Sequence, residues 1–259
     1  MPHQLLTITR HIARITLHNP PANVLNHSVL KELDLVLNEL EEDEYVRVVI
    51  VTGTGRFFCA GADINELAHL NTTHGGSEFA VRGQALLNRI ERSEKPVLAA
   101  INGTCVGGGL ELALACHIRV ATAEAQLGLP EIKLGLIPGF GGTQRLSRIV
   151  GPSKAAEMIL TGKSVPAEEA LRIGLLSRVV PPHELITQVE SIAASIIAHG
   201  KTSVEAALHA IRGGIDIPLS EGLAREAELF GRLCATPDKQ EAVEAFLKKR
   251  QPKLAETEV

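Results

Sequence analysis

Alternating apolar and polar residues mark the first elements of the chain. Residues 5–9 and 12–17 alternate with a period of two and are separated by Arg10 and His11, a pattern that predicts two antiparallel strands joined as a hairpin. From residue 28 to about residue 43, leucine and valine recur at helical spacing, which predicts an amphipathic helix. Ser28 is the predicted N-cap, because its side-chain oxygen can accept a hydrogen bond from an amide of the first turn.

Continuous apolar runs come next, and they predict buried strands. These runs cover residues 46–52, 97–101 and 117–122. Between the first two runs, the polar, glycine-containing residues 70–77 predict a mobile loop, and residues 78–93 predict a helix. Because strands alternate with helices, we expect the fold class to be α/β.

The pattern changes toward the C-terminus. From about residue 182 the chain is helical in pattern and contains no further strand signal, with glycine breaks at residue 200 and residues 213–214. We therefore expect a core domain of residues 1–199 and a C-terminal helical region of residues 200–259.

Composition and charge argue against nucleic-acid-binding, metal-binding and membrane proteins. Hydrophobic residues make up 45% of the 259 residues and charged residues 22%, as in ordinary globular domains. A net charge of -4 gives no basic surface for nucleic acid. The four cysteines form no CxxC pair and no zinc pattern with histidine, so we expect no metal and a reducing compartment. No signal-peptide core or apolar run near the ~20 residues of a membrane span is present, so a cytoplasmic protein without membrane contact is expected.

Candidate chemistry begins after the apolar run 97–101. The glycines 107–109 open a predicted helix that carries Glu111 in its first turn. Glycine allows another molecule to approach the backbone closely. The first amides of a helix have no partner within it and carry partial positive charge. This stretch is therefore suited to stabilising a developing negative charge.

A second glycine-rich turn lies at residues 136–144 and is preceded by Glu131. Two carboxylates beside one site can act as a general acid and base, because burial shifts their pKa values apart. The alternative for either glutamate is a surface position or an arginine partner. Other site classes are disfavoured: Glu157 replaces the leading glycine of a phosphate loop before Gly162, and no GxSxG motif is present.

Three motifs together resemble the enoyl-CoA hydratase (crotonase) family. They are Phe-Cys-Ala-Gly-Ala-Asp at 58–63, Asn-Gly-Thr-Cys-Val-Gly-Gly-Gly-Leu-Glu at 102–111, and Pro-Glu-Ile-Lys-Leu-Gly-Leu-Ile-Pro-Gly-Phe-Gly-Gly-Thr-Gln-Arg at 130–145. Their order and spacing match over essentially the whole chain. The resemblance implies a crotonase-like spiral of ββα units, with a C-terminal helical region that builds a homotrimer, often a dimer of trimers.

The resemblance also implies a site and a reaction. Ala62 and Gly108 stand where the family uses backbone N–H groups as an oxyanion hole for a thioester carbonyl. Glu111 and Glu131 stand at the two catalytic glutamates of true hydratases, and Gly139 at the amide that helps to hold the water. The implied reaction adds water to a trans-2-enoyl-CoA and gives a 3-hydroxyacyl-CoA. It needs no cofactor, because coenzyme A is part of the substrate.

Substrate contacts follow from the same resemblance. The implied contacts are Ala22, Cys59, Ala60, Gly61, Ala62, Asp63, Ile64, Phe230, Phe246 and Lys249. Asn65 departs from the lysine of a well-known hydratase pattern, so a phosphate contact is not carried over to it. For the two phenylalanines, packing in the core or between subunits is an equally open interpretation. Residues 70–77 and Phe140 are expected to shape the acyl pocket.

Two alternatives stay open at this point. One is an isomerase or another enzyme of the family that works through a thioester enolate. The other is a non-catalytic member that binds RNA or protein. The presence of both glutamates and the negative net charge favour the hydratase. Fatty-acid β-oxidation, amino-acid degradation and aromatic degradation are equally compatible pathways, and the sequence does not indicate acyl chain length.

Overall fold

The structure is a computed structural model and describes residues 4–253. Its larger sheet has six strands in the order β1-β2-β3-β5-β7-β10. The strands are β1 (Gln4–Thr9), β2 (Ile12–Leu17), β3 (Val48–Gly53), β5 (Val97–Ile101), β7 (Ile118–Thr122) and β10 (Arg178–Val180). The hairpin β1–β2 is antiparallel, as predicted, and the remaining neighbours are parallel.

A smaller four-stranded sheet lies beside the first, in the order β4-β6-β8-β9. Its strands are β4 (Phe57–Cys59), β6 (Thr104–Val106), β8 (Gln126–Gly128) and β9 (Val165–Pro166). Along the chain, β3–β4, β5–β6 and β7–β8 each place one strand in each sheet before a helical segment follows. The α/β class and the repeated ββα unit are therefore confirmed.

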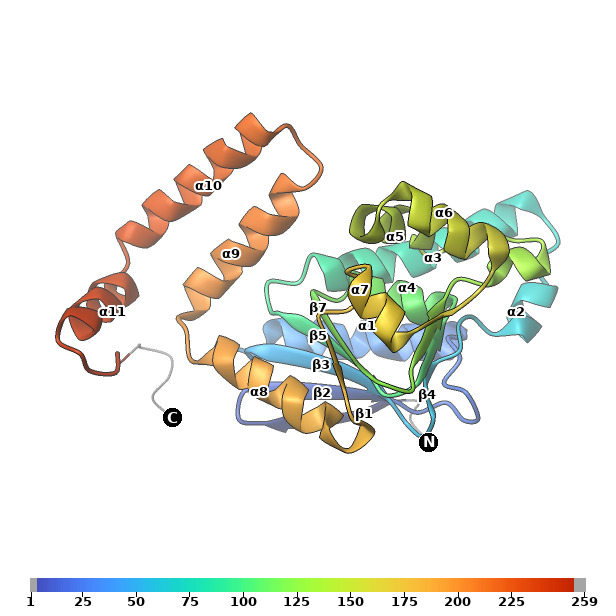
Figure 1. Ribbon diagram of the computed structural model, residues 1–259, viewed down its shortest axis with the longest axis horizontal. Coiled ribbons are helices and arrows are strands. Elements are labelled where there is room, and N and C mark those ends of the chain that lie inside the picture. The colour runs from blue at the N-terminus through green and yellow to red at the C-terminus, as the bar shows by residue number, and fades with distance from the viewer. Residues whose placement is uncertain (1–3, 254–259) are drawn as a thin grey trace.

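Helices cover both faces of the larger sheet (Figure 1). Helix α8 (Leu185–Ile197) packs on one face, against β3, β5 and β7. The other helices up to residue 197 are α1 (His27–Glu42), α2 (Ile64–Ala68), α3 (Thr73–Glu91), α4 (Gly108–Ala115), α5 (Gly142–Val150), α6 (Pro152–Thr161) and α7 (Ala167–Arg172). In β3, Val49 and Val51 face the main core, whereas Val48 and Ile50 face a second cluster built with α8. Alternate residues of a strand point to opposite faces, so a strand buried on both faces is continuously apolar.

Two local predictions were wrong. The N-cap of α1 is Asn26, whose side chain accepts a hydrogen bond from Val29 N at 2.9 Å. Ser28 instead donates its hydroxyl to Asn26 Oδ1 at 2.8 Å. The expected loop 70–77 is mostly helix, because Thr72 caps α3 by accepting from Gly75 N at 3.1 Å. A good cap and the packed remainder of a long helix offset the roughly 1 kcal/mol that each helical glycine costs.

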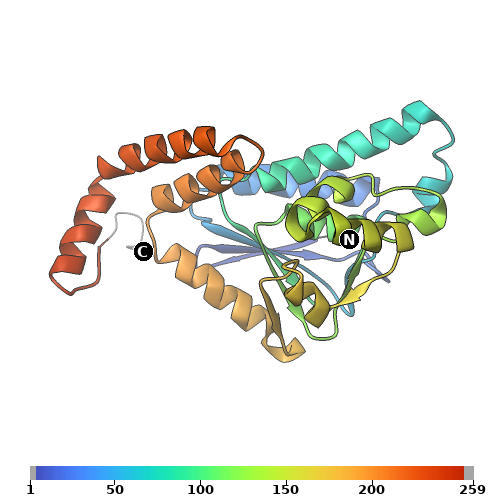
Figure 2. The ribbon, with the colours of Figure 1, turned by 45° about the horizontal axis from the view of Figure 1, so that its top comes forward.

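The last three helices form an arm that extends away from the two sheets (Figures 1 and 2). This C-terminal arm comprises α9 (Lys201–Gly214), α10 (Leu219–Cys234) and α11 (Pro237–Leu247). Along the described length of α9 and α10 no residue is buried, and in α11 only Ala245 is. The arm begins where the sequence predicts a boundary, and the division into two domains stays a prediction. None of the described helices is both long and apolar enough to cross a membrane.

Candidate active site

The end of β4 lies against the beginning of α4, backbone to backbone. A Cβ added to Gly61 would fall 3.2 Å from Val106 O and 3.3 Å from Gly108 N. A Cβ added to Gly108 would fall 3.3 Å from Ala62 N. The two segments can approach this closely because glycine has no side chain.

This approach places the amides of Ala62 and Gly108 side by side. The segment is held by Leu25, whose N–H donates to Gly61 O at 2.8 Å and whose carbonyl accepts from Asp63 N at 3.3 Å. Among the described residues, neither the Ala62 nor the Gly108 amide donates to an acceptor. Two unpaired N–H donors are thus available to one oxygen atom, which is the arrangement of an oxyanion hole.

Glu111 lies in the first turn of α4 and is 2% exposed. Its Oε1 accepts hydrogen bonds from Phe140 N and Gly142 N, both at 2.7 Å. Burial raises the pKa of Glu111 to about 7, although the two hydrogen bonds act in the opposite direction and the negative charge of Glu131 adds to the rise. The surface alternative is therefore wrong for Glu111.

Glu131 opens the 3₁₀ helix Glu131–Leu134 and is half-buried. Its Oε1 would lie 3.0 Å from a Cβ added to Gly107, so the carboxyl group sits over the start of α4. Its Oε2 is buried and has no hydrogen-bond partner within residues 4–253. Burial raises the pKa of this group as well. Two carboxyl groups with raised pKa values beside a pair of free amides are suited to exchanging protons with a substrate.

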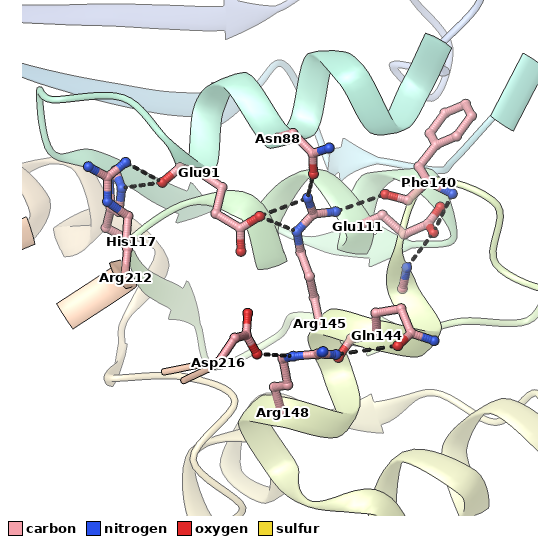
Figure 3. Close-up of polar contacts among 11 residues, drawn as sticks. Asn88, Glu91, Glu111, His117, Phe140, Gln144, Arg145, Arg148, Arg212 and Asp216 are labelled. Atoms are coloured by element: carbon pink, nitrogen blue, oxygen red, sulfur yellow. Dashed lines mark hydrogen bonds and ion pairs between the residues drawn. The ribbon is translucent and has the colours of Figure 1, made fainter. Parts of the chain in front are cut away.

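The loop of residues 138–142, here called the Glu111 loop, packs against Glu111, with Phe140 beside its carboxylate (Figure 3). A Cβ added to Gly142 would fall 3.0 Å from Glu111 Cγ, and Gly139 O accepts from Gln84 Nε2 at 2.9 Å. The Phe140 ring lies against α3, with its centroid 5.1 Å from that of Phe79. The sequence motifs indicate Gly139 but not the two amides that hold Glu111, because every residue except proline carries a backbone N–H and residue type gives no further signal for it.

Most of the implied substrate contacts gather here. Ala60 N donates to Ala22 O at 3.0 Å, which places the 59–64 segment beside Ala22. Cys59 is fully buried, and burial raises the pKa of its thiol to about 12, so the thiol stays protonated at neutral pH. Asp63 accepts from Asn65 N at 2.8 Å and caps α2, and Ile64 is exposed.

The remaining three implied contacts lie elsewhere. Phe230 and Phe246 are 69% and 83% exposed on the C-terminal arm, and Lys249 is also exposed. Their exposure excludes packing in the core of this chain. The arm lies apart from α4 (Figure 1), so one chain does not bring these residues to Glu111. Residues 4–253 also hold no group of three or more side chains suited to a metal ion.

Comparisons with known proteins show the family to which the chain belongs. A family model described as enoyl-CoA hydratase/isomerase matches residues 7–257. The chain belongs to the enoyl-CoA hydratase/isomerase family. It is 44% identical to the short-chain-enoyl-CoA hydratase of Clostridium acetobutylicum, over 93% of this chain and 92% of that protein.

Two further family members support the same assignment. The crotonyl-CoA hydratase of Syntrophomonas wolfei is 40% identical over 93% of both chains. The crystal structure of the enoyl-CoA hydratase from Bacillus anthracis superposes with a TM-score of 0.93 at 39% identity, covering 97% of this chain and 98% of that one. The relatives therefore span the spiral core and the C-terminal arm alike.

Proposed function

We propose that this member of the family is an enoyl-CoA hydratase, a hydro-lyase that converts trans-2-enoyl-CoA to 3-hydroxyacyl-CoA. The proposal rests on one observation. The carboxyl groups of Glu111 and Glu131 lie beside the free amides of Ala62 and Gly108. Hydratase names among relatives at 40–44% identity support it.

The reaction needs charge stabilisation and two proton transfers. The thioester oxygen accepts hydrogen bonds from the two amides, which stabilise the negative charge that develops when water attacks the β-carbon. We assign Glu131 as the main acid and base, since its buried Oε2 has no partner among the described residues. It takes a proton from water as the carbon–oxygen bond forms and then gives a proton to the α-carbon, which regenerates the Glu131 carboxylate.

Glu111 has a different role in this scheme. Its Oε1 is held by two amides, which leaves Oε2 to orient the attacking water together with the amide of Gly139. We propose no metal and no separate cofactor. Ala22 and the 59–64 segment line the path of the coenzyme A portion.

We further propose that the chain forms a homotrimer and that two trimers pair into a hexamer, as in the family's dimers of trimers. We also propose that it acts in the cytoplasm, in fatty-acid β-oxidation. The support for association is the C-terminal arm, which presents large exposed apolar residues away from the core. They are Ile211, Ile215, Leu219, Leu223, Phe230, Phe246 and Leu247. In such an assembly, Phe230, Phe246 and Lys249 contact the acyl-CoA bound by a neighbouring copy.

The decisive experiment follows the loss of the conjugated enoyl-thioester absorbance of crotonyl-CoA. We expect rapid loss with wild type and a decrease in kcat of about 10²–10⁴-fold for Glu131→Gln, because a positioned acid–base group contributes that much. Glu111→Gln should also be strongly impaired. Glu168→Gln is the matched control, since Glu168 is exposed on α7.

Two results would contradict the proposal. A folded Glu131→Gln variant with near-normal hydration would remove Glu131 from the chemistry. Wild-type enzyme that acts on 3-enoyl-CoA but on no 2-enoyl-CoA would indicate isomerisation instead.

A further inference from the structure

Arg145 lies behind the Glu111 loop, on α5, and is 8% exposed. Its Nη1 donates to Phe140 O at 2.9 Å. Its Nη2 donates to Asn88 Oδ1 at 2.6 Å and to Glu91 Oε2 at 2.9 Å, and its Nε donates to the same Glu91 oxygen at 3.1 Å (Figure 3). One guanidinium therefore joins the Glu111 loop to the last turns of α3.

The loop is shaped to receive this guanidinium. Gly141 has a φ of +107°, and a Cβ added to it would fall 2.4 Å from Arg145 Nη1. Phe140 is engaged through both backbone groups, because its carbonyl accepts from Arg145 and its N–H donates to Glu111. Any rotation of the peptide units around Phe140 would thus move the donors that hold the Glu111 carboxylate.

We propose that Arg145, held by Glu91 and Asn88, is a positioning residue that orients the Glu111 loop and thereby keeps the Glu111 carboxylate in its water-orienting place. This inference rests on the proposed function insofar as Glu111 acts on water. A planar guanidinium can bridge three acceptors from two elements, whereas a lysine ammonium is a single point charge without the fork.

The charge of Arg145 also acts on Glu111. Glu111 faces the negative charge of Glu131, which raises its pKa, and the positive charge of Arg145, which lowers it. Removal of Arg145 therefore raises the pKa of Glu111 further and leaves more of it protonated at neutral pH.

The experiment compares R145Q with R148Q. Both variants remove one positive charge from α5, but Arg148 is exposed and pairs with Asp216 at 2.9 Å, away from the loop carbonyl. For R145Q we expect kcat for crotonyl-CoA hydration to fall about tenfold to a hundredfold, the scale of a catalytic group misplaced by about 1 Å, with little change in KM. The acidic limb of its pH profile should move to higher pH. R148Q should match wild type in both respects.

Amide hydrogen exchange supplies a readout that does not depend on activity. The Phe140 and Gly142 amides should lose protection in R145Q and keep it in R148Q. If wild type hydrates no 2-enoyl-CoA, the proposed function fails, and the exchange result still decides the positioning role.

A folded R145Q enzyme whose kcat, acidic limb and amide protection equal those of R148Q would overturn the proposal. If R145Q does not fold, the R145K variant tests the proposal instead. Lysine keeps the positive charge but lacks the planar, forked set of N–H donors of the guanidinium. Wild-type kcat and an unmoved acidic limb in R145K would then overturn the proposal, whereas lowered kcat with lost amide protection would support it.

Discussion

At the scale of single residues, Glu111 is the most constrained group of the site. It is almost fully buried, yet it accepts two short hydrogen bonds from backbone amides of the Glu111 loop. Burial disfavours its charged form, and the hydrogen bonds favour it. The result is a carboxyl group whose pKa of about 7 lies near neutral pH, as a group that handles water and protons requires.

The raised pKa of Glu111 has a consequence for stability. The folded-state pKa of about 7 exceeds the ordinary 4.5. The contribution of Glu111 to the free energy of unfolding is therefore fully present below about pH 4.5 and is lost as the pH rises to about 7. A shift of this size corresponds to roughly 3 kcal/mol. Glu111→Gln keeps an oxygen that can accept from both amides and removes the buried charge. We expect urea unfolding to show the variant more stable than wild type at pH 8 and equal to it at pH 4.

The matched control for this prediction is again Glu168→Gln, which changes an exposed carboxylate and should not alter the pH dependence of unfolding. A Glu111→Gln variant that is no more stable than wild type at pH 8 would contradict the prediction. The same variant should lose activity, as expected where a functional group is kept at the expense of stability.

At the scale of elements, α4 is the centre of the fold. All eight of its residues are buried, and its N-terminus meets the end of β4 in backbone contact. Gly109 shows how closely the two elements pack, because an added Cβ would fall 2.2 Å from Cys59 O. The two amides that we propose as the oxyanion hole therefore depend on how these elements pack, because Ala62 follows β4 and Gly108 opens α4.

Gly109→Ala should test this packing. We expect destabilisation of about 1–3 kcal/mol, as for other overpacked cores, and a lower kcat, because β4 and α4 must separate. Thermal unfolding and crotonyl-CoA hydration measure the two effects.

Gly76→Ala is the comparison, since Gly76 lies within α3 with nothing within 4 Å of its added Cβ. It should raise stability by about 0.5–1 kcal/mol. If Gly109→Ala and Gly76→Ala had the same effect on stability and on kcat, the contact between α4 and β4 would not be tight.

At the scale of the whole molecule, the C-terminal arm extends away from the two sheets rather than packing into their core. It contributes almost nothing to the described core, and it exposes large apolar side chains. Several large apolar side chains exposed on one segment of the fold are typical of an interaction site. A second copy of the chain is the partner that we propose.

Phe246→Ser should weaken self-association, because it removes a phenylalanine that is 83% exposed on the arm. Sedimentation velocity should show a shift toward monomer at low protein concentration. Leu160→Ser is the control, since Leu160 is 69% exposed but lies on α6, outside the arm. A wild-type chain that sediments as a monomer, or a dissociated Leu160→Ser variant, would contradict the assignment of the interface to the arm.

Much of the fold is readable from local pattern. The hairpin β1–β2 and the buried strands β3, β5 and β7 follow from periodicity, since burial on one or both faces dictates which positions are apolar. The start of α3 cannot be predicted from periodicity. The Thr72 cap and the length of the helix stabilise it by more than the glycines at 75 and 76 destabilise it. The N-cap of α1 differs for a similar reason, since Asn26 and Ser28 are both suitable cap residues and only geometry selects one.

The sequence by itself determined which residue types are present for the chemistry: two glutamates, each beside a glycine-rich turn, in motifs typical of one family. Side-chain identity is local information, so it is visible without a structure. Only the tertiary structure decided that Glu111 is held at 2.7 Å by two amides and that Glu131 keeps an unpartnered oxygen among the described residues. It also decided that Arg145 reaches the loop carbonyl. Those contacts join backbone and side-chain groups far apart in the chain, and their directions are set by how the elements pack.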